Sequence, residues 1–289
     1  MAFPTVLVTG LGFMGGSLAA ALRQAGWPVL LHHRRPEVTQ RAVALGFGEA
    51  VADLAAGAAR ADVAVVCTPV GAIAATVRTI AAAPGHAVVT DIGSVKGSLC
   101  SELADLATTG RFVGSHPMAG SHVQGLEHAR PALYQGCMTV LTPLPATPEP
   151  AIALVDRMWS AIGARRCRLA PNVHDRAVAE ASHLPHVLAA TTAAGLGANG
   201  TPLAASGFRD TTRIAGASPE LWSDILLHNR DAVLAGLSSA SGRLQALSGA
   251  LERGDAAAVT AWLEVGRAGR QRYEQAARSA VVTDQVEEE

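Results

Sequence analysis

The chain has 289 residues, 49% of them hydrophobic, and a formal net charge of -1. This length and composition allow two domains with a sizeable buried core, and the charge gives no support to nucleic-acid binding. No apolar run approaches the roughly 20 residues that a membrane span requires. The four cysteines are scattered without a CxxC pair, and no charged-then-apolar leader is present, so we expect reduced thiols in a cytoplasmic protein.

The first motif is a glycine-rich loop between a strand and a helix. A β-branched run over residues 5–9 leads into Gly10-Leu11-Gly12-Phe13-Met14-Gly15-Gly16, and a helical pattern follows over 17–24. In a dinucleotide-binding fold the first glycine allows a tight turn, the second admits the pyrophosphate, and the third lets helix and strand pack closely. The motif predicts cofactor binding, with a plain glycine-rich turn as the alternative. The residues expected to bind are Gly10, Gly12, Phe13, Met14 and Gly15.

The end of the second predicted strand, residues 29–32, carries the sequence His33-Arg34-Arg35. An NAD site usually offers Asp or Glu to the ribose hydroxyls at this place. Without an acid, and with two guanidinium groups able to grip a phosphate, the site favours a 2′-phosphate and therefore NADP. A solvated loop is the alternative, and Glu37 keeps NAD open.

Two further buried strands are predicted over residues 62–68 and 87–92. Their carboxyl ends lie on the ligand side of a doubly wound sheet, so we expect Thr68, Pro69 and Val70 to contact the cofactor. Ser94 and Lys96 follow the second of these strands and are expected to contact cofactor or substrate. Ser94 could equally cap a helix that begins near Val95.

A histidine is placed between glycines in Gly114-Ser115-His116-Pro117-Met118-Ala119-Gly120. The apolar run before it, residues 111–113, is predicted as a strand that ends beside this segment. Pro117 biases His116 toward an extended backbone. A histidine held at a strand end is a candidate proton acceptor near neutral pH.

A strand over residues 137–141, a helix over 151–162 and a last strand over 166–169 complete the first domain. From Asn172 onward only helical patterns follow. The sequence therefore predicts an α/β fold: an N-terminal doubly wound, Rossmann-type dinucleotide-binding domain followed by an all-α C-terminal domain. The boundary is placed near Pro171, which gives a first domain of residues 1–170 and a helical substrate and dimerisation domain of residues 171–289.

The predicted helix from Asn172 or Asp175 to Leu196 contains two histidines on one face, His183 and His186, with a kink expected at Pro185. No third ligand type is clustered nearby, so we expect no metal. Core histidines are the alternative to pocket histidines.

Arg213 lies beside the apolar Ile214 in a polar island over residues 208–215, and burial of its charge would require an anionic partner. That partner is either Asp210 or a substrate carboxylate. Ser218 and Pro219 then begin a predicted long helix.

The predicted helix after Ser218 carries apolar residues at spacings of seven, four and three, a seam suited to another helix. Such a seam fits packing within the chain or against a partner, and with a further helix over 259–277 it suggests a homodimer. The seam residues are Leu226, Val233, Leu237, Ala240, Leu244, Leu247 and Leu251.

The residues alone predict a dinucleotide-binding domain followed by a helical domain, with a histidine between them. This organisation is typical of an oxidoreductase. Hydride transfer from an alcohol carbon needs a base for the hydroxyl proton, and imidazole, with a pKa near 6.5, suits that role.

Five motifs together resemble the prephenate/arogenate dehydrogenase family of tyrosine biosynthesis. The resemblance spans nearly the whole chain and implies oxidation and decarboxylation of a cyclohexadiene acid, with His116 as the base for the ring hydroxyl and NADP or NAD as the hydride acceptor. The motifs are the glycine loop at 10–18, Asp91-Ile92-Gly93-Ser94-Val95-Lys96, His116-Pro117-Met118-Ala119-Gly120, Ser182-His183-Leu184-Pro185-His186 and the segment 208–215.

The same resemblance implies that Ser94 hydrogen-bonds the reacting hydroxyl and His116, that Arg213 pairs with a substrate carboxylate, and that His183 and His186 line the pocket. Many relatives carry an acid or amide at the position of His122, where it contacts the side-chain end of the substrate. His122 therefore leaves the choice between prephenate and arogenate open.

Two rival functions are a two-domain NADP-dependent dehydrogenase or reductase acting on β-hydroxy acids or imines, and a non-catalytic NADP-binding sensor. Enzymes of the first kind typically use a lysine in the helical domain, and residues 171–289 contain none. A sensor would need neither a base nor an anion-binding arginine.

Overall fold

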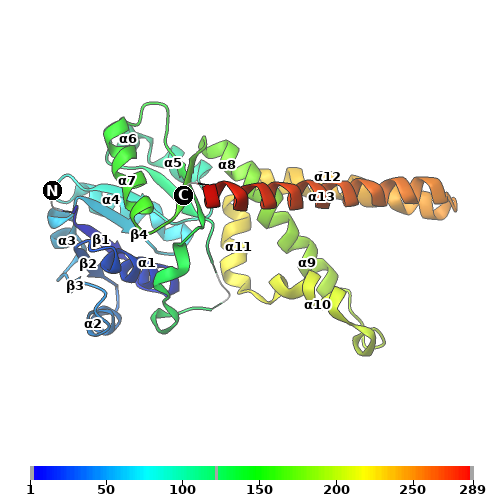
Figure 1. Cartoon of the computed structure of the whole chain (residues 1–289), viewed down its shortest axis with the longest axis horizontal. Coiled ribbons are helices and arrows are strands. Elements are labelled where there is room, and N and C mark those ends of the chain that lie inside the picture. Colours follow the sequence, from blue (N-terminus) through cyan, green and yellow to red (C-terminus); the bar gives the residue numbers. More distant parts are fainter. Residues whose placement is uncertain (1–2, 121–122, 287–289) are drawn as a thin grey trace. The chain divides into compact units, whose positions relative to one another are not determined.

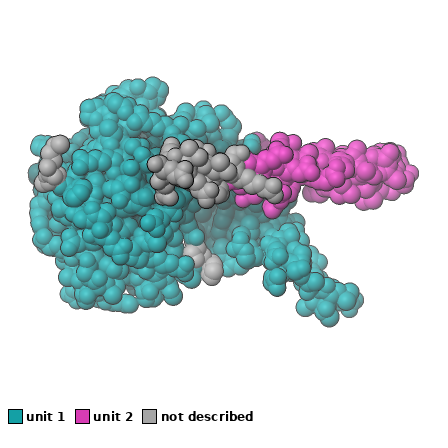
Figure 2. Space-filling model, viewed as in Figure 1, with its two compact units in different colours: residues 1–233 teal, residues 234–289 magenta. Residues whose placement is uncertain are grey.

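The computed structural model describes residues 3–120 and 123–286 (Figure 1). The chain forms two compact units, Met1–Val233 and Leu234–Glu289, shown in different colours in Figure 2.

The first unit begins with a five-stranded, fully parallel sheet in the order β3-β2-β1-β4-β5. Apolar residues fill the central strands because both faces of the sheet are covered by helices. β1 lies in the centre, where Leu7 is paired with Leu30 of β2 and Ala64 of β4. The strands are β1 (Val6–Thr9), β2 (Val29–His32), β3 (Glu49–Ala50), β4 (Val63–Val66) and β5 (Val88–Asp91).

Alternation along β1 divides the hydrophobic core into two layers. Val6 and Val8 pack in one cluster with Leu18 of α1, whereas Leu7 packs in the other with Ile73 of α4. Successive strand residues point to opposite faces, so helices cover both sides and the predicted doubly wound domain is confirmed. The helices up to β5 are α1 (Phe13–Gln24), α2 (Pro36–Ala44), α3 (Leu54–Arg60) and α4 (Val70–Ala82).

A second sheet of three strands follows, with β6 antiparallel to β7 and β7 parallel to β8. The prediction of a strand over residues 111–113 was wrong. Only Phe112 bridges to β5, and the strand proper starts at Gly114, so His116 lies inside β6 rather than after a strand. The elements are α5 (Gly97–Glu102), α6 (Ala104–Thr108), β6 (Gly114–Pro117), η1 (Leu126–His128), η2 (Pro131–Tyr134), β7 (Met138–Thr142), α7 (Glu149–Ala161) and β8 (Arg165–Arg168).

Among the described residues after β8 the structure is helical, as predicted. The segment from Pro171 to Ala194 runs through a π-helical turn that ends at His183, and Pro185 is the second residue of the helix that follows. A proline inside a regular helix lacks an N–H and collides with the preceding turn, and the wider π turn places Pro185 in the first turn of a new helix. The elements are α8 (Pro171–Val178), the π turn η3 (Ala179–His183), α9 (Leu184–Ala194), η4 (Thr201–Leu203), α10 (Ser206–Thr212), η5 (Arg213–Gly216) and α11 (Pro219–His228).

The predicted long helix after Ser218 is interrupted at Asn229. Ser218 caps α11 as expected, with its Oγ accepting the Leu221 N–H at 3.3 Å, and α12 (Arg230–Glu252) starts after the break. No helix among the described residues has the length and apolarity to cross a bilayer.

The second unit is a helical hairpin made of the greater part of α12 and of α13 (Ala256–Val286). The Trp262 indole on α13 donates to the Arg243 carbonyl on α12 at 2.8 Å. Ala240 and Ala250 are buried, whereas Leu244 and Leu251 of the predicted seam are 53% and 61% exposed. A two-helix unit has too little interior to bury the whole seam.

Candidate active site

The glycine loop has the geometry that a dinucleotide requires. Gly10 has φ +94°, and a Cβ there would lie 2.5 Å from the Cys67 carbonyl oxygen. A Cβ on Gly15 would collide with the Gly10 carbonyl, so these two glycines permit the turn and the close packing. A Cβ on Gly12 would meet nothing within 4 Å, which leaves open space beside the helix N-terminus.

A second feature at the same edge of the sheet suits a polar ligand. The Thr68 hydroxyl, after β4, is buried and has no hydrogen-bond partner among the described residues. Pro69 precedes α4 and is exposed, whereas Val70, its first residue, is partly buried. The open space at Gly12 and the unpaired hydroxyl of Thr68 fit a bound dinucleotide.

Phe13 and Met14 face the protein with their side chains. Phe13 is buried beneath the Arg130 guanidinium, whose carbon lies 5.9 Å from the ring centre. The Met14 carbonyl accepts a hydrogen bond from the Tyr134 hydroxyl at 2.8 Å. What these two residues can offer a dinucleotide is therefore main-chain N–H groups in the first turn of α1.

The residues after β2 form a loop with one unpaired arginine. His33 Nδ1 accepts the Arg35 N–H at 3.0 Å, and the Arg35 guanidinium is 3.9 Å from Glu37. Arg34 is exposed and has no ion-pair partner in the described part of the chain. Burial is the main cause that lowers the pKa of His33, so its ring is neutral at pH 7 and the positive charge of the loop resides on the arginines.

β6 directs two neighbouring side chains to opposite faces. The Ser115 hydroxyl points into the core, where it donates to the Asp91 carbonyl at 2.6 Å and accepts the Trp159 indole N–H at 3.2 Å. His116 points the other way, toward α8. The buried serine thereby fixes the strand that presents the histidine.

Lys96 lies in this buried network rather than in an open pocket. Its side chain has no exposed surface, and its ammonium forms an ion pair with Asp91 and donates to the Ser115 carbonyl at 3.0 Å. Asp91 also accepts the N–H groups of Gly93 at 2.8 Å and Ser115 at 3.2 Å. A buried charge pair with its remaining hydrogen bonds satisfied fixes the main chain around it.

His116 contacts a second histidine that the sequence prediction did not include. Its Nδ1 lies 2.8 Å from Nε2 of His174 on α8, and the Nδ1–H of His174 donates to Asp175 Oδ1, also at 2.8 Å. Desolvation is the largest cause that lowers the pKa of His116 well below its usual value, and the neighbouring His174, Lys96 and His183 add to it. The imidazole is therefore neutral near pH 7 and can accept a proton.

Asp175 also anchors the loop that carries Ser94. Its two carboxylate oxygens accept the main-chain N–H groups of Lys96 at 2.8 Å and Gly97 at 2.7 Å. The helix here begins at Gly97, and Asp175 takes the place at its N-terminus that Ser94 was considered for as a cap. The Ser94 hydroxyl has no partner within the described residues and remains available to a ligand.

His183 and His186 lie beside one another against Trp222 of α11. The His186 ring stacks on the indole with centres 3.5 Å apart, and its buried Nδ1 has no partner in the described chain. Asn229 Nδ2 lies 3.1 Å from His183 Nδ1 and donates to the Asp175 carbonyl at 2.9 Å. Burial lowers the pKa of both histidines, to about 4 for His183.

Arg213 lies at the start of η5, which packs against α9. It is exposed and forms no ion pair with any described residue. Asp210, the alternative partner, is paired with Arg209 at 3.2 Å instead. Arg213 is therefore available to an external anion.

Two further expectations concern His122 and metal binding. His122 lies outside the described residues. In the part of the chain that the structure describes, no group of three His, Cys, Asp or Glu side chains is arranged to hold a metal ion.

His174, Asp175 and Asn229 are the residues of this site that sequence reasoning missed. His174 and Asp175 form an adjacent acid–base pair just after Pro171, which was a usable signal. Asn229 is recognisable only from the break between α11 and α12, because a single buried amide has no sequence pattern.

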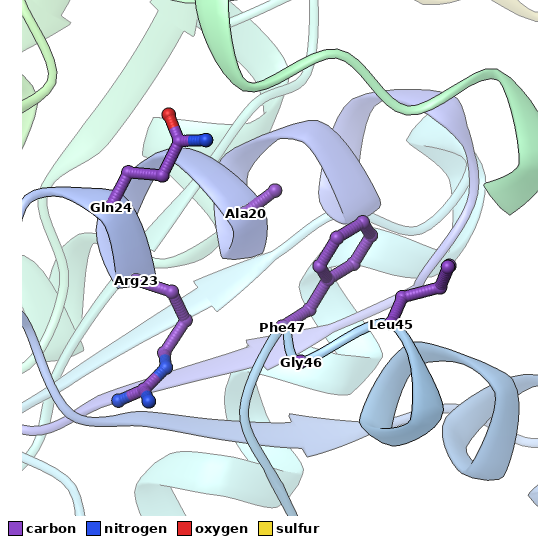
Figure 3. Close-up of a pocket in the computed structure, with 6 residues that line it drawn as sticks. All are labelled: Ala20, Arg23, Gln24, Leu45, Gly46 and Phe47. Carbon is purple, nitrogen blue, oxygen red and sulfur yellow. The ribbon is translucent and has the colours of Figure 1, made fainter.

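A separate hollow of about 250 Å³ lies at the other end of α1, between that helix and the turn after α2 (Figure 3). Figure 3 shows the side chains of Arg23 and Gln24 beside the hollow and the Phe47 ring opposite Ala20. It lies away from the carboxyl ends of the strands, so it is not the dinucleotide site.

Comparison with known proteins gives two matching family models, the prephenate dehydrogenase nucleotide-binding domain over residues 18–168 and the prephenate dehydrogenase dimerization domain over residues 170–265. A prephenate dehydrogenase of Bacillus subtilis is 34% identical over 243 residues, which are 80% of this chain and 65% of that protein. The chain thus spans just under two thirds of that relative's length.

Solved structures agree with these matches. Prephenate dehydrogenase from A. aeolicus, in complex with hydroxyphenyl propionate and NAD+, superposes with a TM-score of 0.86 at 30% identity, over 94% of this chain and 99% of that one. Synechocystis arogenate dehydrogenase gives a TM-score of 0.83 at 30% identity, over 93% and 99% of the two chains.

Proposed function

The chain belongs to the prephenate dehydrogenase family, and on that premise we propose that it oxidises and decarboxylates prephenate or arogenate in tyrosine biosynthesis. The product is 4-hydroxyphenylpyruvate or tyrosine. The observation that carries the proposal is a neutral His116, hydrogen-bonded to His174, on the strand that follows the dinucleotide-binding sheet.

His116 accepts the proton of the ring hydroxyl as the adjacent carbon loses its hydride. NAD(P)+, when bound along the glycine loop, supplies the hydride acceptor. Ser94 donates to or accepts from the same hydroxyl, because its own hydroxyl is unpaired in the described structure. Loss of the ring carboxylate as CO2 makes the ring aromatic, so the reaction is effectively irreversible.

Arg213 binds a substrate carboxylate, and His183 and His186 line the pocket. The support is that Arg213 is exposed without an ion-pair partner in the described chain, on a turn packed against the helix that carries His186. A guanidinium offers a planar two-point contact to a carboxylate. Lys96, which was expected to contact substrate, is instead a support for the strand that presents His116.

The cofactor preference that we propose is NADP. Arg34 follows β2, is exposed, and has no acidic partner among the described residues, which suits a 2′-phosphate. NAD remains the alternative, since Glu37 lies three residues further on.

Domain limits at 1–170 and 171–289 are supported by the two family matches, which meet between residues 168 and 170. We also propose a cytoplasmic location, which suits four cysteines that are all free thiols.

Dimerisation through the helical domain is supported by the exposed leucines of the hairpin. A second copy could cover these leucines. Sedimentation velocity of the full chain should give a dimer at micromolar concentration, and a monomer there would contradict the proposal.

The function is tested by following cofactor reduction with the purified full chain, using prephenate and arogenate each with NAD+ and NADP+. Saturable turnover with at least one substrate, accompanied by release of CO2, is expected. A protein that binds cofactor but reduces none with either substrate would contradict the proposed reaction.

A further inference from the structure

Asp175 lies where two hydrogen-bond chains meet. Its carboxylate holds His174, which contacts His116. Its main-chain carbonyl accepts a hydrogen bond from Asn229, which contacts His183. His174, Asp175, His183 and Asn229 are all buried, so the few protons in these chains are constrained by their partners rather than by water.

The positions of the protons in the first chain follow from the acceptors. A carboxylate oxygen only accepts, so the proton between Asp175 and His174 is on His174 Nδ1. When each imidazole carries a single proton, His174 offers the lone pair of Nε2, and the Nδ1 that faces it on His116 at 2.8 Å donates. Neutral His116 with its proton on Nδ1 has an unprotonated Nε2.

The second chain gives the opposite result for His183. The Asn229 amide nitrogen lies 2.9 Å from the Asp175 carbonyl, and the reversed amide would place two oxygens together. The same nitrogen therefore also donates to His183 Nδ1 at 3.1 Å. Neutral His183 then carries its proton on Nε2 and is a hydrogen-bond donor, whereas His116 is an acceptor.

We infer that Asp175 is the positioning residue of this site: through His174, its carboxylate holds His116 in the tautomer whose Nε2 can accept the hydroxyl proton of the substrate. When that proton arrives, the negative charge on Asp175 stabilises the cation shared by the two imidazoles. The inference rests on the proposed function for the source of the proton, but the tautomer is a property of the protein alone.

A double-mutant cycle separates this role from anchoring of the loop, because the Asp175 carboxylate also accepts the N–H groups of Lys96 and Gly97. Asp175→Asn should lower kcat by about 10²-fold or more with little change in KM. His174→Gln is the matched variant, since it removes the relay and leaves the acceptors for Lys96 and Gly97 in place.

If Asp175 acts through His174, the kcat of the double variant should lie within about threefold of the kcat of the slower single variant. The reason is that the effects of substitutions on kcat are not additive when the residues act as a unit. A His174→Gln variant with wild-type kcat, or effects that multiply in the double variant, would overturn the inference and leave Asp175 as a loop anchor. Thermal unfolding of each variant checks that it is folded.

An independent measurement uses 15N-labelled histidine in the unliganded full chain at pH 8. The expected spectrum shows His116 protonated at Nδ1 and unprotonated at Nε2, assigned by comparison with His116→Asn. A proton on Nε2 of His116 would overturn the inference. Absence of turnover with both substrates would instead count against the proposed function, and the tautomer would still be decided by the spectrum.

Discussion

His116 is surrounded by groups that oppose its protonation. Burial is the largest cause that lowers the pKa of His116, and the positive charge of the nearby Lys96 adds to it. Asp91, the buried carboxylate of this region, is engaged by Lys96, and the carboxylate of Asp175 reaches His116 only through His174. The neutral imidazole is thus kept as a base at the pH of the reaction.

Replacing His116 tests this role directly. His116→Asn should lower kcat by roughly 10²-fold or more, because a general base contributes at least that much, while cofactor affinity stays unchanged. Steady-state rates and a cofactor titration check both expectations. The control is His128→Asn, an exposed histidine of η1, which should keep full activity. An unchanged kcat in the His116 variant would remove it from the mechanism.

Arg34 is the residue on which the cofactor preference depends. Arg34→Ala should weaken NADP+ binding by ten-fold or more and NAD+ binding far less, since only NADP+ carries the 2′-phosphate. Binding of each cofactor is measured by fluorescence titration. Arg23→Ala is the charge-matched control, because Arg23 lies in the last turn of α1, at the end away from the glycine loop. Equal losses for the two cofactors would contradict the assignment.

The sequence predicted site residues that have a recognisable local motif around them. It missed residues whose role depends on contacts with distant parts of the chain. His116 is flagged by Pro117 and the flanking glycines. His174 acquires its role only because α8 brings it to β6, 58 positions away in sequence. Lys96 looked like a ligand contact because it is polar after a strand, and its pairing with Asp91 inside the core is a tertiary effect.

Among the elements, the glycine loop shows how neighbouring glycines serve different ends. Gly10 is needed by the fold, because its backbone has a positive φ and a side chain there would collide with the Cys67 carbonyl. Gly12 has φ -83°, which alanine adopts without strain, and its missing side chain leaves open space. One glycine therefore serves stability and the other serves ligand access.

A pair of alanine substitutions separates these roles. Gly12→Ala should leave the free energy of unfolding within about 0.5 kcal/mol of the wild type but weaken cofactor binding at least ten-fold. Gly10→Ala should lower the free energy of unfolding by about 2 kcal/mol or more. Urea unfolding and cofactor titration measure the two effects. A Gly12 variant with normal affinity would contradict the placement of the pyrophosphate.

β1, β2, β4 and β5 of the parallel sheet were predictable because each is a short apolar run bounded by turn or polar residues. The prediction did not include β3, whose two exposed residues, Glu49 and Ala50, have no strand composition. The prediction lost accuracy where local signals compete with tertiary contacts. Residues 111–113 have a strand composition, yet pairing with β7 begins only at Gly114. The helical pattern is interrupted at Asn229, whose side chain hydrogen-bonds to Asp175 and His183. The periodicity of the sequence does not predict these hydrogen bonds.

For the molecule as a whole, the lowered histidine pKa values link stability to pH. His116, His183 and His186 all have folded-state pKa values below 6.5, about 4 for His183, so between those values and 6.5 the unfolded chain binds more protons than the folded chain. Stability should be unaffected by these groups above pH 6.5 and should fall as the pH drops toward 4.

Thermal unfolding at pH 7.5, 6.5, 5.5 and 4.5 measures this dependence. The midpoint Tm should fall progressively below pH 6.5, and a His183→Asn variant should lose less between pH 6.5 and 4.5 than the wild type. The exposed carboxylates Glu49, Asp105 and Glu149 have lowered pKa values through their arginine partners, so their contribution is lost only at more acid pH. A Tm that rises on acidification from pH 6.5 would contradict the expectation.

The bonds from Asp175 to the main chain of Lys96 and Gly97 have a consequence for modular engineering. They join a residue of the first helix after the sheets to the loop after β5. A chimera that takes its first 170 residues from one family member and the remainder from another would have to reproduce these bonds and the His116–His174 contact together. Chimeras joined at that boundary should therefore be inactive more often than variants with substitutions within either part, although the sequence suggests a domain boundary there.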